Sequence, residues 1–324
     1  MMKLIASVSG ICLLLFCIIF SCKPSGDSAE RTFSNISIVD SIELELPLRR
    51  IIYQNGNYYS YDYYSKSLFK HDINFKIIDS LGKKGEGPTE NLMVRNYQLL
   101  GSEKIMIFDT EKHAYKVQDF SDSVYLYHKF ITPVVRGVAV NDSLLITIAS
   151  LTDLKLGFSY YDLNSLGSIA IDKINSLFDV ENSAMIYEGK LIQEGKYVIH
   201  TSYFADHWFV FNTENNELKV SSYRYEFENP KVLEFGGGVM LDNAPDLIAD
   251  SFASGSRLFV ISNVGEKEFP EQRVLDIYDL ETTEYITSYV LPKLQDSAAS
   301  EGFYVENERI GLRYEDYLYF MQMD

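Results

Sequence analysis

Residues 77–90, IIDSLGKKGEGPTE, decide how the chain is interpreted. An alternating apolar segment runs into a turn that contains Gly82, Gly85, Gly87 and Pro88. Glycine adopts backbone angles that other residues resist, and proline restricts the direction in which the chain leaves the turn. The stretch therefore predicts a loop that crosses from one strand to another. A phosphate-binding loop is the alternative, but no Ser or Thr follows a Gly-Lys pair here and no amphipathic helix comes next, so the structural turn is favoured.

Similar strand-like segments recur along the chain at intervals of about fifty residues, each group led by a turn signal. The second strands of six groups are expected at residues 58–62, 104–109, 143–149, 196–202, 257–263 and 309–314. Third strands are expected at residues 67–72, 114–119, 158–162, 208–212, 275–279 and 319–324. Fourth strands follow in five groups, at residues 75–81, 123–130, 167–172, 217–223 and 284–290. Short antiparallel strands repeated at this period are typical of propeller blades, so the sequence predicts an all-β, six-bladed β-propeller with four-stranded antiparallel blades.

The sixth group ends at Asp324 without a fourth strand. Residues 36–46, ISIVDSIELEL, alternate apolar and polar side chains and so have the pattern of a strand. Because an open sheet edge exposes unpaired backbone groups, we expect this N-terminal strand to close the last blade. No segment has a long helical period, and residues 172–182 are expected to hold one short helical turn at most.

The N-terminal residues have a different composition. Residues 1–21 carry the basic Lys3 and a ten-residue apolar run that is too short to span a bilayer, which is typical of a signal peptide. Residues 19–22, IFSC, resemble a bacterial lipobox, and this resemblance implies that Cys22 becomes lipidated; ordinary signal cleavage nearby is the alternative. All three cysteines lie at or before this position, so the rest of the chain has no thiol for a disulfide or a zinc site.

Domain organisation and partners follow from these observations. Residues 22–34 are expected to be a lipidated cysteine and a flexible tether, and residues 35–324 the propeller. Lipid on Cys22 would hold the protein on a membrane of the cell envelope, at the periplasmic face or on the outer membrane. The formal net charge of −17 and the lack of a Lys/Arg cluster argue against a nucleic-acid partner. We expect a monomer, without a cofactor.

The repeat, the lipobox and the glycine-rich turn together resemble the six-bladed β-propeller lipoproteins of Gram-negative bacteria, the NHL-like and TolB-like group. In that group the crossing after the first blade often reads G-x-x-G-x-G-P-G-E. The matching residues here are Gly82, Gly85, Gly87, Pro88 and Glu90, while Thr89 replaces the last glycine. The resemblance covers residues 36–324 and implies the fold; most members of the group have no assigned reaction.

Some residue sets are candidates for catalysis or metal binding. His200, Asp206 and His207 lie close together in sequence, but their spacing matches known metal-ligand patterns only loosely. No G-x-S-x-G sequence occurs, and nothing in the sequence places a serine beside a histidine. A metal-dependent propeller hydrolase or lyase, with its site in the central channel, is the alternative function. It would draw on oxygen ligands from the inner strands, for which the candidates are Asn96, Asn141, Asp250 and Glu301.

The leading interpretation is a ligand- or protein-binding propeller without catalysis. Inner strands line the axial channel of a propeller, so side chains at the starts of these strands converge at one mouth. The candidate ligand-binding residues are Arg50, Glu90, Arg95, Asn96, Arg136 and Glu301. The three arginines would suit a carboxylate or another anion, carried by a small molecule, a glycan, a peptide or an envelope protein. The structural alternative is that each arginine pairs with an acidic residue of its own blade.

Overall fold

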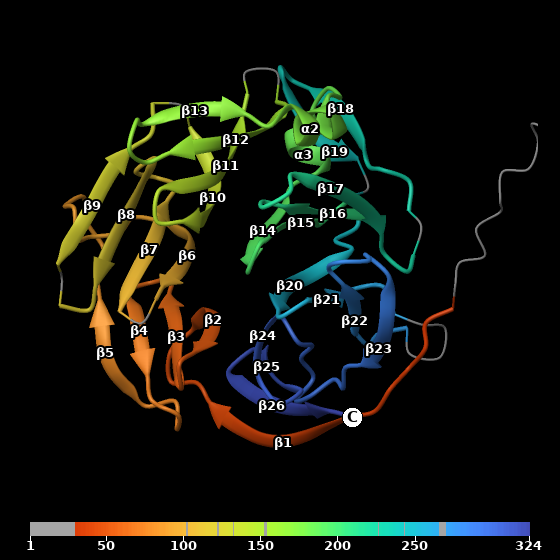
Figure 1. The fold of residues 1–324 in the computed structure, drawn as a ribbon. Helices are drawn as coiled ribbons and strands as arrows, with labels where there is room; N and C mark the ends of the chain where they lie inside the picture. The colour runs from red at the N-terminus through yellow and green to blue at the C-terminus, as the bar shows by residue number, and fades with distance from the viewer. Residues whose placement is uncertain are drawn as a thin grey trace, which may run out of the picture.

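The computed structural model describes residues 30–324, apart from residues 102, 122, 132, 152–153, 226, 243 and 266–269. The expected signal peptide, Cys22 and the first part of the tether lie outside the described residues. In the described part of the chain, six four-stranded antiparallel sheets are arranged as blades around a central axis (Figure 1). The predicted all-β, six-bladed β-propeller is therefore confirmed.

The first five blades each use four strands in the order in which they occur in the chain. Blade 1 consists of β2 (Leu48–Gln54), β3 (Asn57–Asp62), β4 (Leu68–His71) and β5 (Ile77–Leu81). Blade 2 consists of β6 (Val94–Leu100), β7 (Lys104–Asp109), β8 (Ala114–Asp119) and β9 (Val124–Lys129). Blade 3 consists of β10 (Val134–Asn141), β11 (Leu144–Ser150), β12 (Leu156–Asp162) and β13 (Gly167–Ala170). Blade 4 consists of β14 (Gly189–Glu194), β15 (Tyr197–Ser202), β16 (His207–Asn212) and β17 (Glu217–Ser222). Blade 5 consists of β20 (Ile248–Ser254), β21 (Arg257–Ser262), β22 (Val274–Asp279) and β23 (Tyr285–Val290).

Blade 6 joins the two ends of the chain. It consists of β24 (Glu301–Glu306), β25 (Arg309–Tyr314), β26 (Tyr317–Met323) and the N-terminal β1 (Ile36–Glu43). β1 pairs antiparallel with β26, from Ile36 opposite Met323 to Glu43 opposite Tyr317. The predicted closure by the N-terminal strand is confirmed, and it covers an edge of β26 that would otherwise be unpaired.

Apolar clusters fill the spaces between neighbouring blades. The middle strands are buried along almost their whole length, as in β15 and β16, because both faces of a blade pack against its neighbours. Between blades 6 and 1, the ring of Tyr58 lies 6.0 Å from that of Phe303 and 5.8 Å from that of Phe320. This two-sided burial explains the high aromatic content, since large flat side chains suit pleated surfaces that pack on both faces.

The segment just before β1 forms a strap along the outer edge of blade 5. Phe33 forms a parallel bridge with Ser288 of β23. The guanidinium of Arg31 donates to both carboxylate oxygens of Asp276, at 3.0 and 2.9 Å, and these side chains are only 3% and 0% exposed. Residues 30–34 were expected to belong to the tether. The structure differs there, because a buried carboxylate inside blade 5 binds the arginine.

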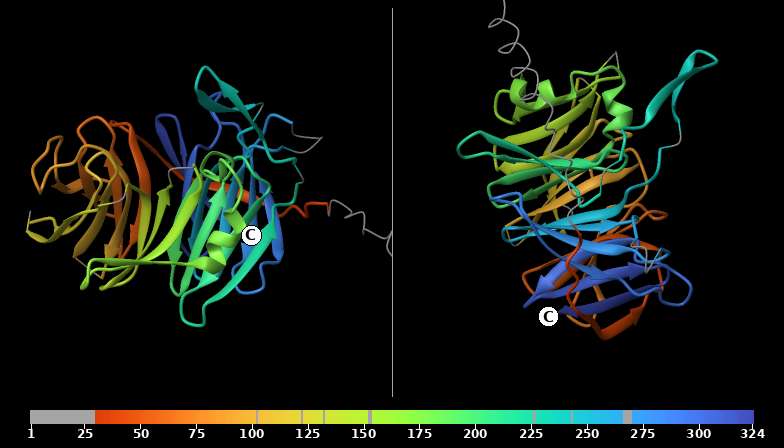
Figure 2. Two further views of the ribbon diagram at one scale, coloured as in Figure 1. Left: turned by 90° about the horizontal axis from the view of Figure 1, so that it is seen from above. Right: turned by 90° about the vertical axis from the view of Figure 1, so that its right-hand side faces the viewer.

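Two insertions interrupt the regular pattern. The crossing from blade 3 to blade 4 contains α2 (Asp172–Asn175), η1 (Ser176–Phe178) and α3 (Ser183–Ile186). The expectation of one short helical turn was therefore too low, and the reason is that Ile174 and Phe178 pack into the apolar cluster between these blades. The crossing from blade 4 to blade 5 contains a hairpin of β18 (Lys231–Phe235) and β19 (Gly238–Asp242), which projects from the propeller (Figure 2). No helix in the described part of the chain is long and apolar enough to cross a membrane.

The glycine-rich loop at residues 82–91 is a structural crossing between blades 1 and 2, as favoured from the sequence. Gly82 has a φ of +73°, and the side-chain amide of Asn91 packs against it. The amide of Asn91 also donates to the carbonyl of Lys66 at 2.7 Å. The ammonium groups of Lys112 and Lys116 each donate to the carbonyl of Glu90, at 2.8 and 2.9 Å. Cationic side chains of blade 2 thus hold the loop through its backbone oxygens.

Candidate functional site

Backbone bulges set the direction of side chains at the start of several inner strands. The register of β6, β10 and β20 against the second strand of the same blade shifts by one residue near the strand start, and β2 has a larger irregularity at the same place. Bulges of this kind redirect side chains and are common near functional sites. The residues at or just after this irregularity are Arg49, Asn96, Arg136 and Asp250. Lys190 and Glu301 lie near the start of β14 and β24, which have no such shift there. We call these six residues the mouth ring.

Members of the mouth ring bind the inner strand of the neighbouring blade. The ammonium of Lys190 lies 2.6 Å from the carboxylate of Asp250, whose other oxygen accepts the backbone N–H of Gly302 at 3.0 Å. The carboxylate of Glu301 accepts the backbone N–H of Arg50 and lies 3.4 Å from the guanidinium of Arg49. On this side of the mouth, positive and negative groups therefore balance each other across blades 4, 5, 6 and 1.

Across blades 1, 2 and 3 the mouth is positively charged. Burial lowers the pKa of the Arg50 guanidinium; Glu301 opposes this, while Arg136 and Arg95 lower the pKa further. The three predicted arginines are thus close enough for their charges to interact. Among the described residues, Arg95 is exposed and has no ion pair, and the one ion-pair partner of Arg136 is the exposed Glu188, at 3.5 Å. The expected alternative, pairing within each blade, is not what the described residues show, because the partners of Arg50 and Arg136 lie outside their own blades.

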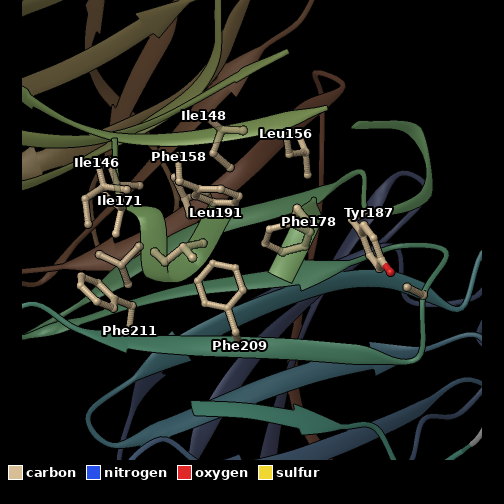
Figure 3. Packing of buried hydrophobic residues seen from close by; sticks show 14 residues of the cluster. Ile146, Ile148, Leu156, Phe158, Ile171, Phe178, Tyr187, Leu191, Phe209 and Phe211 are labelled. Carbon is tan, nitrogen blue, oxygen red and sulfur yellow. The ribbon is translucent and has the colours of Figure 1, made fainter. Parts of the chain in front are cut away.

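A cavity of about 280 Å³ lies beside this positive side of the mouth, between blades 2, 3 and 4. Its apolar wall comes from blade 3, α3 and the residue that follows α3: Val135, Ile148, Leu154, Leu156, Ala184, Met185 and Tyr187. Its polar groups are Arg95, Thr110, Arg136, Ser150, Glu188 and His200. Figure 3 shows Ile148, Leu156 and Tyr187 together with the aromatic cluster that packs behind them.

The projecting hairpin stands near the cavity rim. The side-chain amide of Asn229, just before β18, donates to the hydroxyl of Tyr187 at 3.1 Å. β19 also contacts α3, which contributes Ala184 and Met185 to the cavity wall. Both insertions therefore shape this part of the mouth, and neither was assigned to it from the sequence.

His200 lines the cavity from β15. The residue is 2% exposed, and its ring stacks on that of Phe209, with centroids 5.4 Å apart. The rings of Phe158 and Phe178 approach it edge-on, at 5.7 and 5.8 Å. Burial, followed by the nearby charges of Arg136 and His207, lowers the pKa of His200 to about 3. The imidazole is therefore neutral over the whole physiological pH range.

The remaining sequence candidates fall elsewhere. The carboxylate of Glu90 folds back into its own loop, where it accepts the N–H of Gly87 at 2.8 Å, and it does not line the cavity. The amide of Asn96 donates to the carbonyl of Gly137 at 2.9 Å, so it links blade 2 to blade 3. Glu90 and Asn96 thus both have hydrogen-bond partners within the propeller scaffold.

Of the four oxygen ligands considered for a metal-dependent enzyme, Asn141 lies apart from the other three, which belong to the mouth ring. Asn141 lies at the other end of β10 from the mouth ring, where its side chain accepts the N–H of Ser143 in a turn. Among the described residues, no three or more His, Cys, Asp or Glu side chains form a group that could hold a metal ion. The imidazole of His207 faces Asp206 at 3.3 Å, while His200 lies in the aromatic cluster.

Blade 1 contains a serine–histidine pair that the sequence alone does not bring together. The structure does place a serine beside a histidine, since the hydroxyl of Ser60 lies 2.7 Å from Nε2 of His71. Both residues are buried, at 0% and 1% exposure, and Nδ1 of His71 faces the carbonyl of Phe75 at 3.2 Å. The pair comes from adjacent strands of blade 1 that the sequence does not align. It satisfies buried polar groups inside the blade.

Sequence reasoning missed Thr110, Ser150, Tyr187, Glu188 and His200 as cavity residues. Tyr187 and Glu188 belong to the long crossing before β14, and an unusually long crossing was the available signal. His200 was considered only for metal binding. Its position facing a cavity depends on the register of β15 and on the insertion between blades 3 and 4, which a strand pattern does not reveal.

The fold and the mouth define a six-bladed β-propeller protein. No family model matches the chain, and no curated protein matches it. Solved structures do resemble it. A member of the DUF4221 family from Bacteroides vulgatus has a TM-score of 0.59 and 12% identity, with 91% of this chain and 99% of that chain covered.

Two further similar structures have comparable coverage. A protein from Bacteroides fragilis described as exported has a TM-score of 0.53 and 13% identity, with 91% of this chain and 95% of that chain covered. A streptogramin B lyase has a TM-score of 0.52 and 9% identity, with 90% of this chain and 98% of that chain covered. At such low identity these likenesses establish the propeller fold, and the function must be argued from the site.

Proposed function

We propose that the protein is a non-catalytic binding protein of the cell envelope, and that it binds an anionic ligand at the positive side of its channel mouth. The observation that carries the proposal is the group of Arg50, Arg95 and Arg136 beside a cavity, in a chain whose net charge is −17. A guanidinium group binds a carboxylate through two parallel hydrogen bonds, and a local positive field in an acidic protein attracts anions to that place.

The envelope location rests on the N-terminal sequence. Residues 1–21 have the pattern of a signal peptide, and residues 19–22 resemble a lipobox that would make Cys22 the lipidated N-terminus. The similar Bacteroides fragilis protein is described as exported, which supports the same location. The protein would then be a membrane-anchored lipoprotein like the NHL-like and TolB-like propellers, with the propeller outside the cytoplasm and monomeric.

Titration calorimetry of the purified protein with simple anions tests the binding proposal. Hydrocinnamate, an aromatic carboxylate, and inorganic phosphate serve as probes, with an uncharged amide of hydrocinnamate as the control ligand. Arg95→Ala and Arg136→Ala should each weaken hydrocinnamate binding about tenfold or more, because a charge-assisted hydrogen bond contributes about 1.5–3 kcal/mol. Arg257→Ala is the matched control, since Arg257 lies at the start of β21 and pairs with Glu308 instead.

Two results would refute the proposal. Full affinity in both mouth variants would show that the site lies elsewhere. Circular dichroism measures whether the variants fold. If neither variant folds, these arginines belong to the scaffold. Titration with divalent ions tests the enzyme alternative in the same series, because a metal-dependent propeller would bind such an ion.

A further inference from the structure

The cavity beside the mouth is lined by three chemically different kinds of group. Arg95 and Arg136 stand where it meets the mouth, and Arg95 is exposed. Apolar side chains such as Ile148, Leu156 and Met185 form the wall. His200 is buried, at 2% exposure. A ligand that fills this space therefore meets cations, an apolar surface and an imidazole.

The imidazole of His200 has unused hydrogen-bonding capacity. A neutral imidazole carries one donor and one acceptor nitrogen, and buried polar groups in proteins nearly always have partners. No hydrogen bond joins His200 to any residue in the described part of the chain, and the rings around it belong to phenylalanines. The other buried histidine, His71, uses both of its nitrogens. His200 thus differs from His71 in that it lines a cavity.

The size of the cavity limits what can enter. Binding sites for small molecules generally measure about 300–1,000 Å³. At about 280 Å³ this cavity lies just below that range, so it holds one ring or a short aliphatic chain. A peptide or a glycan chain could place only one terminal group inside it.

We infer that the cavity binds a small carboxylate whose apolar body carries a hydroxyl group at the far end, with the carboxylate at Arg95 and Arg136 and the hydroxyl at His200. The inference rests on the proposed anion site and goes beyond it by naming the class of ligand. The hydroxyl donates to the free imidazole nitrogen or accepts from the protonated one, and the apolar wall covers the ring between the two ends.

A matched pair of ligands tests this assignment. Hydrocinnamate and its para-hydroxyl derivative, phloretate, share the carboxylate and the ring and differ only in the hydroxyl. Titration calorimetry of the purified protein should show that phloretate binds about five- to tenfold more tightly, because one buried hydrogen bond contributes about 1 kcal/mol. His200→Phe keeps an aromatic ring in the cluster and removes both nitrogens, so it should reduce this ratio to about one or below.

The outcomes distinguish a failure of the role assigned to His200 from a failure of the anion site. If the parent protein binds both ligands equally, or prefers hydrocinnamate, the role of His200 is overturned while the anion site stands. The same conclusion follows if His200→Phe folds and keeps the full preference. If neither ligand binds the parent, or if Arg95→Ala and Arg136→Ala bind both with parental affinity, the anion site itself is refuted.

Discussion

Single glycines in this propeller occupy backbone conformations that strain any residue with a Cβ. Gly82 has a φ of +73°, a conformation that costs any residue with a Cβ about 1–2 kcal/mol. A Cβ there would also lie 2.5 Å from the amide nitrogen of the buried Asn91, which already donates to Lys66. Gly255 has a similar φ of +62°, but a Cβ would meet nothing within 4 Å. A Cβ at Gly255 would therefore meet backbone strain alone, whereas a Cβ at Gly82 would meet both backbone strain and a steric clash.

Gly82→Ala should therefore destabilise the protein more than Gly255→Ala does. We expect Gly255→Ala to lower the free energy of unfolding by about 1 kcal/mol, and Gly82→Ala to lower it by at least about 1 kcal/mol more. Urea unfolding followed by far-ultraviolet circular dichroism measures both. Equal effects would mean that the loop at residues 82–91 relaxes freely and does not depend on the packing of Asn91.

His200 provides a pH-dependent signature of burial. In the unfolded chain its pKa is about 6.5, while burial lowers the pKa in the folded protein to about 3. Between these values the unfolded chain binds a proton that the folded protein does not bind, so stability falls as the pH decreases below about 6.5. From pH 7.5 to pH 5, this one group should cost the folded protein about 2 kcal/mol.

The His200→Phe variant isolates this contribution. Its free energy of unfolding should depend less on pH than that of the parent, by about 2 kcal/mol over the same interval. Other groups, including His71, cancel because they are present in both proteins. If the free energy of unfolding of both proteins depends on pH in the same way, His200 has an ordinary pKa and its ring is accessible to water.

At the scale of whole elements, the strap at residues 30–34 depends on one buried ion pair. Asp276 lies in β22 at 0% exposure, and its carboxylate also accepts the hydroxyl of Ser288. The guanidinium of Arg31 further donates to the carbonyl of Val264 at 2.8 Å. A buried carboxylate that loses its cation is strongly destabilising, because the charge stays out of water without compensation.

Arg31→Ala should lower the free energy of unfolding by about 3–5 kcal/mol. The double variant Arg31→Ala, Asp276→Ala should lose less than the sum of the two single variants, since it removes both charges together. Asp40→Ala is the matched control, because Asp40 of β1 meets Arg309 at 3.8 Å on the surface and such pairs contribute at most about 1 kcal/mol. If the loss of stability in the double variant equals the sum of the losses in the two single variants, Arg31 and Asp276 are not energetically coupled.

The strands and the strap show what the sequence alone can predict. Strands of blade 4 were predictable because apolar residues of β15 and β16 are continuous and end at turn residues. Hairpin β18–β19 was missed, although Gly236 and Gly237 between two apolar segments were a usable signal. Arg31 was assigned to a tether, because a short polar segment does not reveal that a carboxylate more than two hundred residues away is buried beside it.

The same distinction applies to the site. Arg50, Arg95 and Arg136 were predictable as neighbours, because the starts of inner strands meet once the fold is known. The cavity was not predictable. It depends on helical residues in the crossing between blades 3 and 4, such as Met185, and on which side chain of β15 faces them. The alternation of apolar and polar residues shows which side chains share a face of a strand. It does not show which of those side chains an insertion covers and which it leaves facing a cavity.

The whole molecule is a closed ring whose two ends meet in blade 6. β1 contributes Ile42 and Ile36 to the apolar clusters on the two sides of that blade. Deletion of residues 30–45 removes the strap and β1 together, which exposes the edge of β26. We expect the melting temperature to fall by about 10 °C or more, because several kcal/mol of packing is lost and each kcal/mol corresponds to about 2–4 °C at this size.

Thermal unfolding and size-exclusion chromatography of this deletion variant test the closure. An exposed strand edge should also promote association between copies. A variant that melts within a degree or two of the parent and stays monomeric would contradict a structural role for the N-terminal strand.

We propose that the positive side of the mouth and the adjoining cavity form one binding site. A crystal structure of the protein with phloretate would locate the ligand. We expect electron density in the cavity, with the carboxylate at hydrogen-bond distance from the guanidinium groups of Arg95 and Arg136 and the hydroxyl at hydrogen-bond distance from the imidazole of His200. Phloretate bound elsewhere on the propeller, with only water in the cavity, would contradict it.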